Sequence, residues 1–110
     1  MIEALRAKPQ RTIIGLMSGS SCDGVDAALV RVAGTGPSLR ARLLAFETLP
    51  FDHAFRAALL RGASGAASVC ALNVAIGQWC ADAVAHLLAR PDAQGVAVDL
   101  VASHGHTLAH

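Results

Sequence analysis

The twelve residues from Gly15 to Asp26, GLMSGSSCDGVD, decide how the chain folds because they join two strongly apolar runs. The first run, residues 12–17 (TIIGLM), extends into the start of this stretch and is rich in β-branched side chains. The second run, residues 25–32 (VDAALVRV), is almost continuously apolar. Both runs predict buried strands covered on both faces. A tight hairpin needs only about two linking residues, so the additional hydroxyls, carboxylates and glycines raise the question of a ligand.

Further elements follow from the same patterns. Residues 33–37 (AGTGP) form a turn, and residues 39–48 predict a third antiparallel strand near an edge of the sheet, with Arg40 and Arg42 on its wetter face. A short helix follows Pro50, and a long helix runs from an N-cap at Ser68 to about Arg90. Residues 96–102 (VAVDLVA) predict a last strand, which a helical crossover would add in parallel.

The composition limits the class of protein. The chain has 110 residues, enough for one domain at most, and a net charge of +1 without a basic run. Aromatic residues make up only 4%, so nucleic-acid binding gains no support. There is no run of 18 consecutive apolar residues, which argues against a transmembrane helix. Three cysteines, an odd number without close pairing, favour reduced thiols in a cytoplasm.

The loop combines groups that suit phosphate. Gly19 and Gly24 permit positive φ angles and a close backbone approach to a ligand, and successive backbone N–H groups in such a turn bind anions. Ser18, Ser20 and Ser21 add hydroxyl donors. The spacing matches neither a Walker A loop nor a dinucleotide fingerprint.

The carboxylates of Asp23 and Asp26 make sense beside phosphate only if a hard cation lies between them, as in a Mg-nucleotide site. Asp23 is the predicted Mg²⁺ residue, acting through water, and Asp26 is expected to orient the loop by accepting backbone N–H bonds. The alternative is an ordinary polar hairpin with Asx-type turns, and spacing alone leaves both interpretations open.

The loop resembles the signature Gly-x-Met-Ser-Gly-Thr-Ser-x-Asp-Gly-x-Asp of the 1,6-anhydro-N-acetylmuramic acid kinases, in the superfamily of sugar kinases, heat-shock ATPases and actin. Ser20 replaces the Thr, and Cys22 takes a variable position. Residues 103–110 (SHGHTLAH) resemble the family's Ser-His-Gly-Gln-Thr-Val-x-His, with His106 in place of Gln, and residues 76–84 (IGQWCADAV) resemble the helix between. The matching loop residues are Met17, Ser18, Gly19, Ser21, Asp23, Gly24 and Asp26.

This resemblance implies an α/β fold with a ribonuclease-H-like mixed sheet: a three-stranded antiparallel meander, helices, then a parallel strand. Residues 1–11 would be a leader and residues 12–110 the incomplete N-terminal part of a two-domain kinase. Such kinases use ATP and Mg²⁺ to open the anhydro ring and phosphorylate the sugar to N-acetylmuramic acid 6-phosphate. They act in bacterial cell-wall recycling in the cytoplasm, and the family suggests a homodimer.

The resemblance also assigns site residues. The general base is expected beyond His110, so this chain alone is expected to hold no catalytic residue and to lack kinase turnover. The sugar side would comprise His104, Gly105, His106 and Thr107. The nucleotide side would comprise Gly19, Ser20, Ser21, Cys22, Asp23, Gly24, Val25 and Asp26.

Other interpretations remain. The chain could be a non-catalytic nucleotide- or ligand-binding module on the same fold. The spacing of His104, His106 and His110 could also bind zinc. Cys22 is expected to point inward as a small apolar side chain, and Cys70 and Cys80 are expected in the core.

Overall fold

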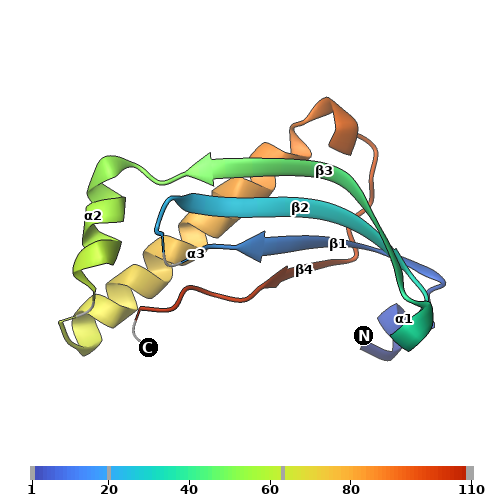
Figure 1. Cartoon of the computed structure of the whole chain (residues 1–110), viewed down its shortest axis with the longest axis horizontal. Coiled ribbons are helices and arrows are strands. Elements are labelled where there is room, and N and C mark those ends of the chain that lie inside the picture. Colours follow the sequence, from blue (N-terminus) through green and yellow to red (C-terminus); the bar gives the residue numbers. More distant parts are fainter. Residues whose placement is uncertain (1, 20, 63, 109–110) are drawn as a thin grey trace.

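The computed structural model describes residues 2–19, 21–62 and 64–108, in which one long helix crosses one face of a four-stranded sheet (Figure 1). Two short 3₁₀ turns, Gly36–Ser38 and Pro91–Ala93, lie in the connections. The elements in chain order are α1 (Ile2–Ala7), β1 (Gln10–Met17), β2 (Gly24–Ala33), β3 (Arg40–Pro50), α2 (His53–Arg61), α3 (Ala66–Leu88) and β4 (Leu100–Ser103).

The sheet has the strand order β3-β2-β1-β4. β1 pairs antiparallel with β2, β2 pairs antiparallel with β3, and β4 lies parallel to β1. The predicted α/β fold with a mixed sheet is therefore confirmed: a three-stranded meander, helices, and a parallel strand. β3 lies at an edge, as its two arginines on the wetter face predicted.

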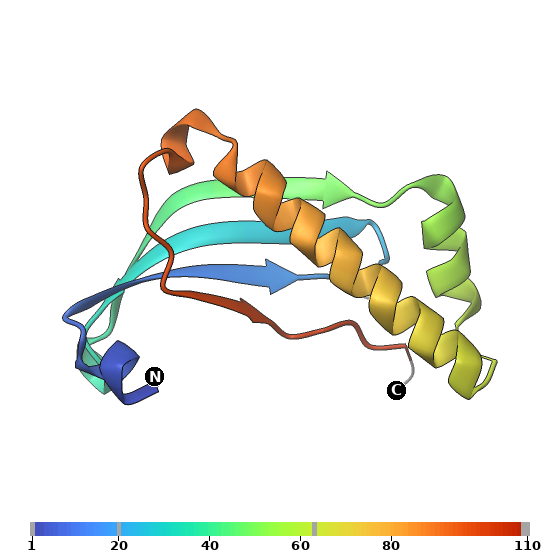
Figure 2. The ribbon, with the colours of Figure 1, turned by 180° about the vertical axis from the view of Figure 1, so that it is seen from behind.

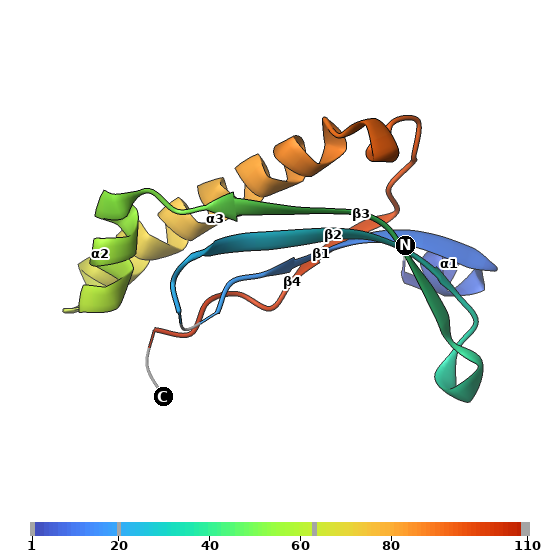
Figure 3. The ribbon, with the colours of Figure 1, turned by 45° about the horizontal axis from the view of Figure 1, so that its top comes forward.

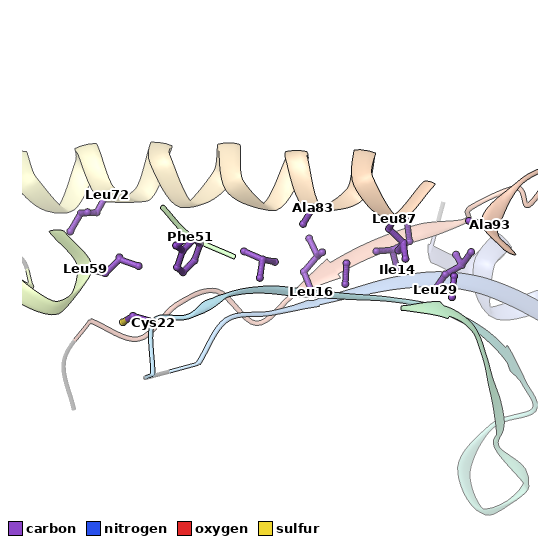
Figure 4. Close-up of a cluster of buried hydrophobic side chains, with 13 residues drawn as sticks. Ile14, Leu16, Cys22, Leu29, Phe51, Leu59, Leu72, Ala83, Leu87 and Ala93 are labelled. Carbon is purple, nitrogen blue, oxygen red and sulfur yellow. The ribbon is translucent and has the colours of Figure 1, made fainter. Parts of the chain in front are cut away.

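The core lies between the sheet and α3, which crosses the sheet as Figure 2 shows from behind. Alternate residues of β1 are buried on this side, because successive side chains of a strand point to opposite faces. Ile14 of β1 and Leu29 of β2 are register partners, and both are fully buried. Leu87 and Ala83 of α3 point toward the sheet in the close-up of Figure 4.

The other face of the sheet is open in the described part of the chain, so the prediction that β1 and β2 are covered on both faces is wrong there. Met17 is 56% exposed, Phe46 46% and Leu100 43%. Met17 and Phe46, together with small residues such as Ala28, line a groove of about 550 Å³. Leu100 lines a separate hollow with Ile13. An almost continuous apolar run fits two-sided burial, but the one long helix covers one face only.

The chain enters its first strand earlier, and its last strand later, than the sequence predicted. The predicted leader 1–11 contains α1 and the first residues of β1. β4 begins at Leu100 rather than at residue 96, because the Asp99 side chain takes part in the pairing: Asp99 Oδ2 accepts the Thr12 N–H at 2.8 Å, and the Asp99 N–H donates to Thr12 O at 2.8 Å. Lys8 Nζ also bonds to Asp99 Oδ1.

The start of α3 corrects a second expectation. Gly65, not Ser68, is the N-cap, and Ser68 lies at the third helical position. From there its Oγ accepts the N–H groups of Ser64 at 2.8 Å and Gly65 at 3.2 Å. Ser68 therefore stabilises the helix start from within the first turn, as the second residue of a capping box does.

α3 is long and apolar enough, by length and composition, to cross a membrane, with a mean hydropathy of 1.2 over 18 residues. In the fold it lies across the sheet instead, and a stripe of polar residues at a spacing of four faces outward. The exposed residues of that stripe are Gln78, Asp82 and His86.

The inward side of α3 is an apolar stripe from Leu72 to Leu87, whereas Val69, one turn before it, is 45% exposed. Cys80 packs against the core, but the prediction that Cys70 lies in the core is wrong, since that side chain is exposed. Trp79 joins α3 to the segment before it: its ring lies 5.2 Å from the Phe51 ring and 5.6 Å from the Phe55 ring.

Candidate functional site

The loop between β1 and β2 is built around a turn in which the Cys22 N–H donates to Gly19 O at 3.0 Å. Among the described residues of this loop, Cys22 has a positive φ, of 55°, and neither Gly19 nor Gly24 has one. The expectation that these two glycines supply positive φ is therefore wrong. Cys22 is buried and points inward, as predicted, and holds a backbone conformation that costs a non-glycine residue free energy.

Gly24 is needed for strand pairing. A Cβ atom at this position would lie 2.4 Å from Leu49 O and 2.8 Å from the Pro50 Cα, so only glycine lets β3 approach β2 here. The next residue, Val25, is fully buried in the core, and its side chain is closed to a ligand. These two predicted nucleotide contacts therefore support the loop from its base.

An arginine from α2 holds the loop. Arg56 Nη2 donates to Ser21 O at 3.2 Å, and its Nε lies 3.6 Å from Asp23 Oδ1. The Asp23 side chain is 75% exposed and open to solvent beside this guanidinium. Arg56 could not be predicted as a loop contact, because nothing in the local pattern of α2 shows that its side chain reaches a residue 35 positions earlier.

Asp26 lies apart from this cluster, on the open face of the sheet. Its Oδ1 accepts the hydroxyl of Thr48, its register partner on β3, at 2.7 Å. The expectation that Asp26 orients the loop through backbone N–H groups is therefore not met. Asp26 lines the open groove together with His104. The structure thus separates the two carboxylates that the sequence placed around one cation.

The two sequence motifs meet at His106. Its Nδ1 lies 2.6 Å from Ser18 Oγ, and its Nε2 lies 3.7 Å from Cys22 Sγ. Ser18 is only 7% exposed. In Figure 3 the β1–β2 loop and the last segment of the chain come together at the same end of the sheet. The predicted phosphate side and the predicted sugar side are therefore neighbours.

The last segment leaves β4 through a tight turn at Gly105, whose φ of 77° favours glycine. The Gly105 N–H donates to Ser103 Oγ at 3.0 Å, and His104 Nδ1–H donates to Gly105 O at 2.7 Å. This turn sends neighbouring side chains to different places. His104 lines the open groove, whereas His106 faces α3.

His106 and Gly105 line a cavity of about 200 Å³ against the first half of α3. Its walls are mainly apolar, and His106 and Asn73 are the polar side chains among them. Thr107, also predicted on the sugar side, is exposed and does not line this cavity. The remaining lining residues are Val69, Leu72, Ile76 and Leu108.

Two predictions fall partly outside the described residues. Ser20, a predicted phosphate donor, lies there, and so does His110, the third histidine of the zinc alternative. Within residues 2–19, 21–62 and 64–108, no group of three or more His, Cys, Asp or Glu side chains is placed to hold a metal ion. His104 and His106 are instead engaged in separate contacts.

The fold and the site together define a class: an α/β protein with a mixed sheet, in which a glycine- and hydroxyl-rich loop after the first strand meets a histidine-containing segment after the parallel strand. The sequence pattern of the family "Anhydro-N-acetylmuramic acid kinase" matches residues 11–110. The chain belongs to this family.

Curated relatives carry the same name. The chain is 40% identical to the anhydro-N-acetylmuramic acid kinase of Salinibacter ruber over 97% of its length, and 34% identical to that of Caldanaerobacter subterraneus over 94%. The kinase of Synechococcus elongatus is 39% identical over 89% of the chain. The chain spans 28%, 27% and 26% of these relatives, respectively.

Proposed function

We propose that this chain supplies the nucleotide-phosphate loop and one side of the sugar pocket of an ATP-dependent anhydro-N-acetylmuramic acid kinase of bacterial cell-wall recycling. The observation that carries the proposal is the contact of His106 with Ser18, which unites the two family-like motifs in one site. In the reaction, ATP, water and 1,6-anhydro-N-acetylmuramic acid give ADP and N-acetylmuramic acid 6-phosphate. Water adds at C1 as the C1–O6 bond breaks, its proton passes to a general base, and O6 receives the γ-phosphoryl group.

The loop residues fit the phosphates of ATP with a magnesium ion. Ser21 is exposed, and the Arg56 guanidinium beside it adds a positive charge. The exposed Asp23 carboxylate can bind a water of hydrated Mg²⁺, which usually keeps several waters and takes one or two carboxylates. When bound, Mg²⁺ neutralises phosphate charge. Asp26 has no part in this arrangement, because it lies on the open face with Thr48.

The cavity beside His106 fits part of a sugar. Apolar walls suit a methyl group or a ring face, and the polar groups of His106 and Asn73 suit hydroxyl or amide groups. His104 is excluded from this cavity by the turn at Gly105, so we assign only Gly105 and His106 to the sugar side. The homodimer implied by the resemblance remains a prediction, which sedimentation velocity tests.

The proposed nucleotide side is tested by measuring the affinity of the chain for ATP with Mg²⁺ by calorimetry. Because Asp23 is the carboxylate beside the phosphate loop, we expect Asp23→Ala to weaken the binding by roughly tenfold, the effect of about 1.4 kcal/mol. Asp82→Ala, on the exposed side of α3, is the matched control and should bind as the unmodified chain does. Equal affinities for the chain and Asp23→Ala would contradict the Mg²⁺ assignment.

A further inference from the structure

The loop between β1 and β2 is held from two sides. On one side, α2 holds it through Arg56. On the other side, His106 contacts Ser18, where the loop leaves β1, and Cys22, just before it enters β2. A single imidazole thus touches both ends of the turn, from a position 88 residues beyond Ser18 in the sequence.

The contact at Cys22 falls on the strained residue of the loop. Its φ of 55° is uncommon for a residue with a side chain, and surrounding contacts must hold such a conformation. Its side chain is 4% exposed and lies 3.7 Å from His106 Nε2. The imidazole therefore lies where it can keep this conformation in place.

The same imidazole also forms part of the cavity wall. It lines the cavity with four residues of α3, which are uncharged: Val69, Leu72, Asn73 and Ile76. Any shift of His106 would change the shape of the cavity and the contacts of the loop together. Coupling between neighbouring sites needs such a shared element.

We propose that His106 is a positioning residue, which fixes the backbone of the β1–β2 loop at Ser18 and Cys22 through its two ring nitrogens and couples these loop residues to the cavity on α3. The hydrogen bond to the buried Ser18 hydroxyl is the principal contact. A glutamine side chain, with one N–H donor group and one carbonyl acceptor, can replace this bond, whereas leucine cannot. The loop conformation itself does not depend on the proposed function, but its consequence for ATP does.

Amide hydrogen exchange of the chain tests the proposal, with His106→Leu, His106→Gln and a matched control, His104→Leu. His104 bonds within its own segment, to Gly105 O. We expect His106→Leu to speed exchange of the described loop amides, such as those of Ser21 and Cys22, by roughly five- to tenfold, because one partly buried hydrogen bond is lost. Exchange in the β2–β3 ladder should stay unchanged, His106→Gln should restore the slow exchange, and His104→Leu should leave it unaltered.

Ser18→Ala removes the same bond from the loop side, and should speed the same amides if His106→Leu does not fold. Unchanged loop exchange in a folded His106→Leu or Ser18→Ala chain would overturn the proposal, and so would a failure of His106→Gln to restore it. ATP affinity, measured on the same variants, is a separate result. If the unmodified chain shows slow, His106-dependent loop exchange but binds no ATP, the nucleotide assignment fails and the positioning role stands.

Discussion

At the scale of single residues, Gly19 and Gly24 have different roles, although the sequence predicted the same role for both. A Cβ atom on Gly24 would meet backbone atoms of β3, whereas the nearest described atom to a Cβ on Gly19 would be Ser21 Oγ, at 3.9 Å. Neither residue has a positive φ. The difference lies in the pairing of β2 with β3, which loop spacing does not reveal.

We expect Gly24→Ala to destabilise the fold by about 1–3 kcal/mol, since overpacking against backbone forces the strands apart. Gly19→Ala is the matched control and should change stability by less than about 0.5 kcal/mol. Urea unfolding followed by circular dichroism measures both. Equal stabilities of the two variants would contradict the close approach of β3 at Gly24.

The Asp99 carboxylate is expected to make the stability of the fold depend on pH in the acid range. Its hydrogen bond with Lys8 and, second, the Thr12 N–H hold the pKa of this carboxyl below its usual value. A lowered pKa in the fold adds stability that is present above the unfolded pKa of about 4 and is lost as the pH falls through the folded pKa.

Asp99→Asn should therefore reduce the loss of stability between about pH 5 and pH 2, as measured by thermal unfolding at several pH values. Lys8→Met removes the larger cause of the shift and should reduce the acid loss in the same direction. A variant whose stability falls with acid as steeply as that of the unmodified chain would show that Asp99 is not the residue responsible.

At the scale of elements, α3 contributes the helical side of the core. Leu87 is fully buried between α3 and the sheet, whereas Val74, on the same helix, is 61% exposed. We expect Leu87→Ala to cost about 2–5 kcal/mol of unfolding free energy, and Val74→Ala less than about 1 kcal/mol. If chemical denaturation shows equal losses, α3 does not pack against the sheet as described.

The strands and helices from residue 12 onward and the parallel direction of the last strand could be predicted, because apolar periodicity indicates the elements and a helical crossover implies a parallel strand. The beginning of the last strand could not be placed, since the Asp99 side chain substitutes for a backbone partner of Thr12. Coverage of the sheet was also predicted wrongly: an apolar run indicates burial but does not say how many layers the described chain provides.

At the scale of the whole molecule, the sequence predicted a site from two segments, and the structure places these segments in contact in a way that the sequence did not specify. The meeting of Ser18 with His106 depends on β4 lying parallel to β1, which brings both strand ends to one edge. The alternation of side chains along β2 directs Asp26 to the open face, whereas Asp23 lies in the loop before that strand. Arg56 of α2 contacts Ser21 and Asp23 of the loop, and no local sequence pattern predicts such a long-range contact.

One face of the sheet is open in the described residues, and the chain spans 28% of the length of the Salinibacter ruber relative. The residues described here hold a phosphate-type loop and a cavity, and we expect no kinase turnover from the 110-residue chain alone. Incubation of the purified chain with ATP and the anhydro sugar, followed by detection of ADP and the sugar 6-phosphate, tests this expectation.

The central claim, that this chain provides a working part of an anhydro-sugar kinase site, is tested most directly by a hybrid. In it, residues 1–110 replace the matched segment of the Salinibacter ruber relative, and formation of N-acetylmuramic acid 6-phosphate from ATP and the anhydro sugar is measured. We predict turnover that falls at least about tenfold with Asp23→Ala. A folded hybrid that binds ATP but makes no sugar phosphate, beside an active unmodified relative, would contradict the account.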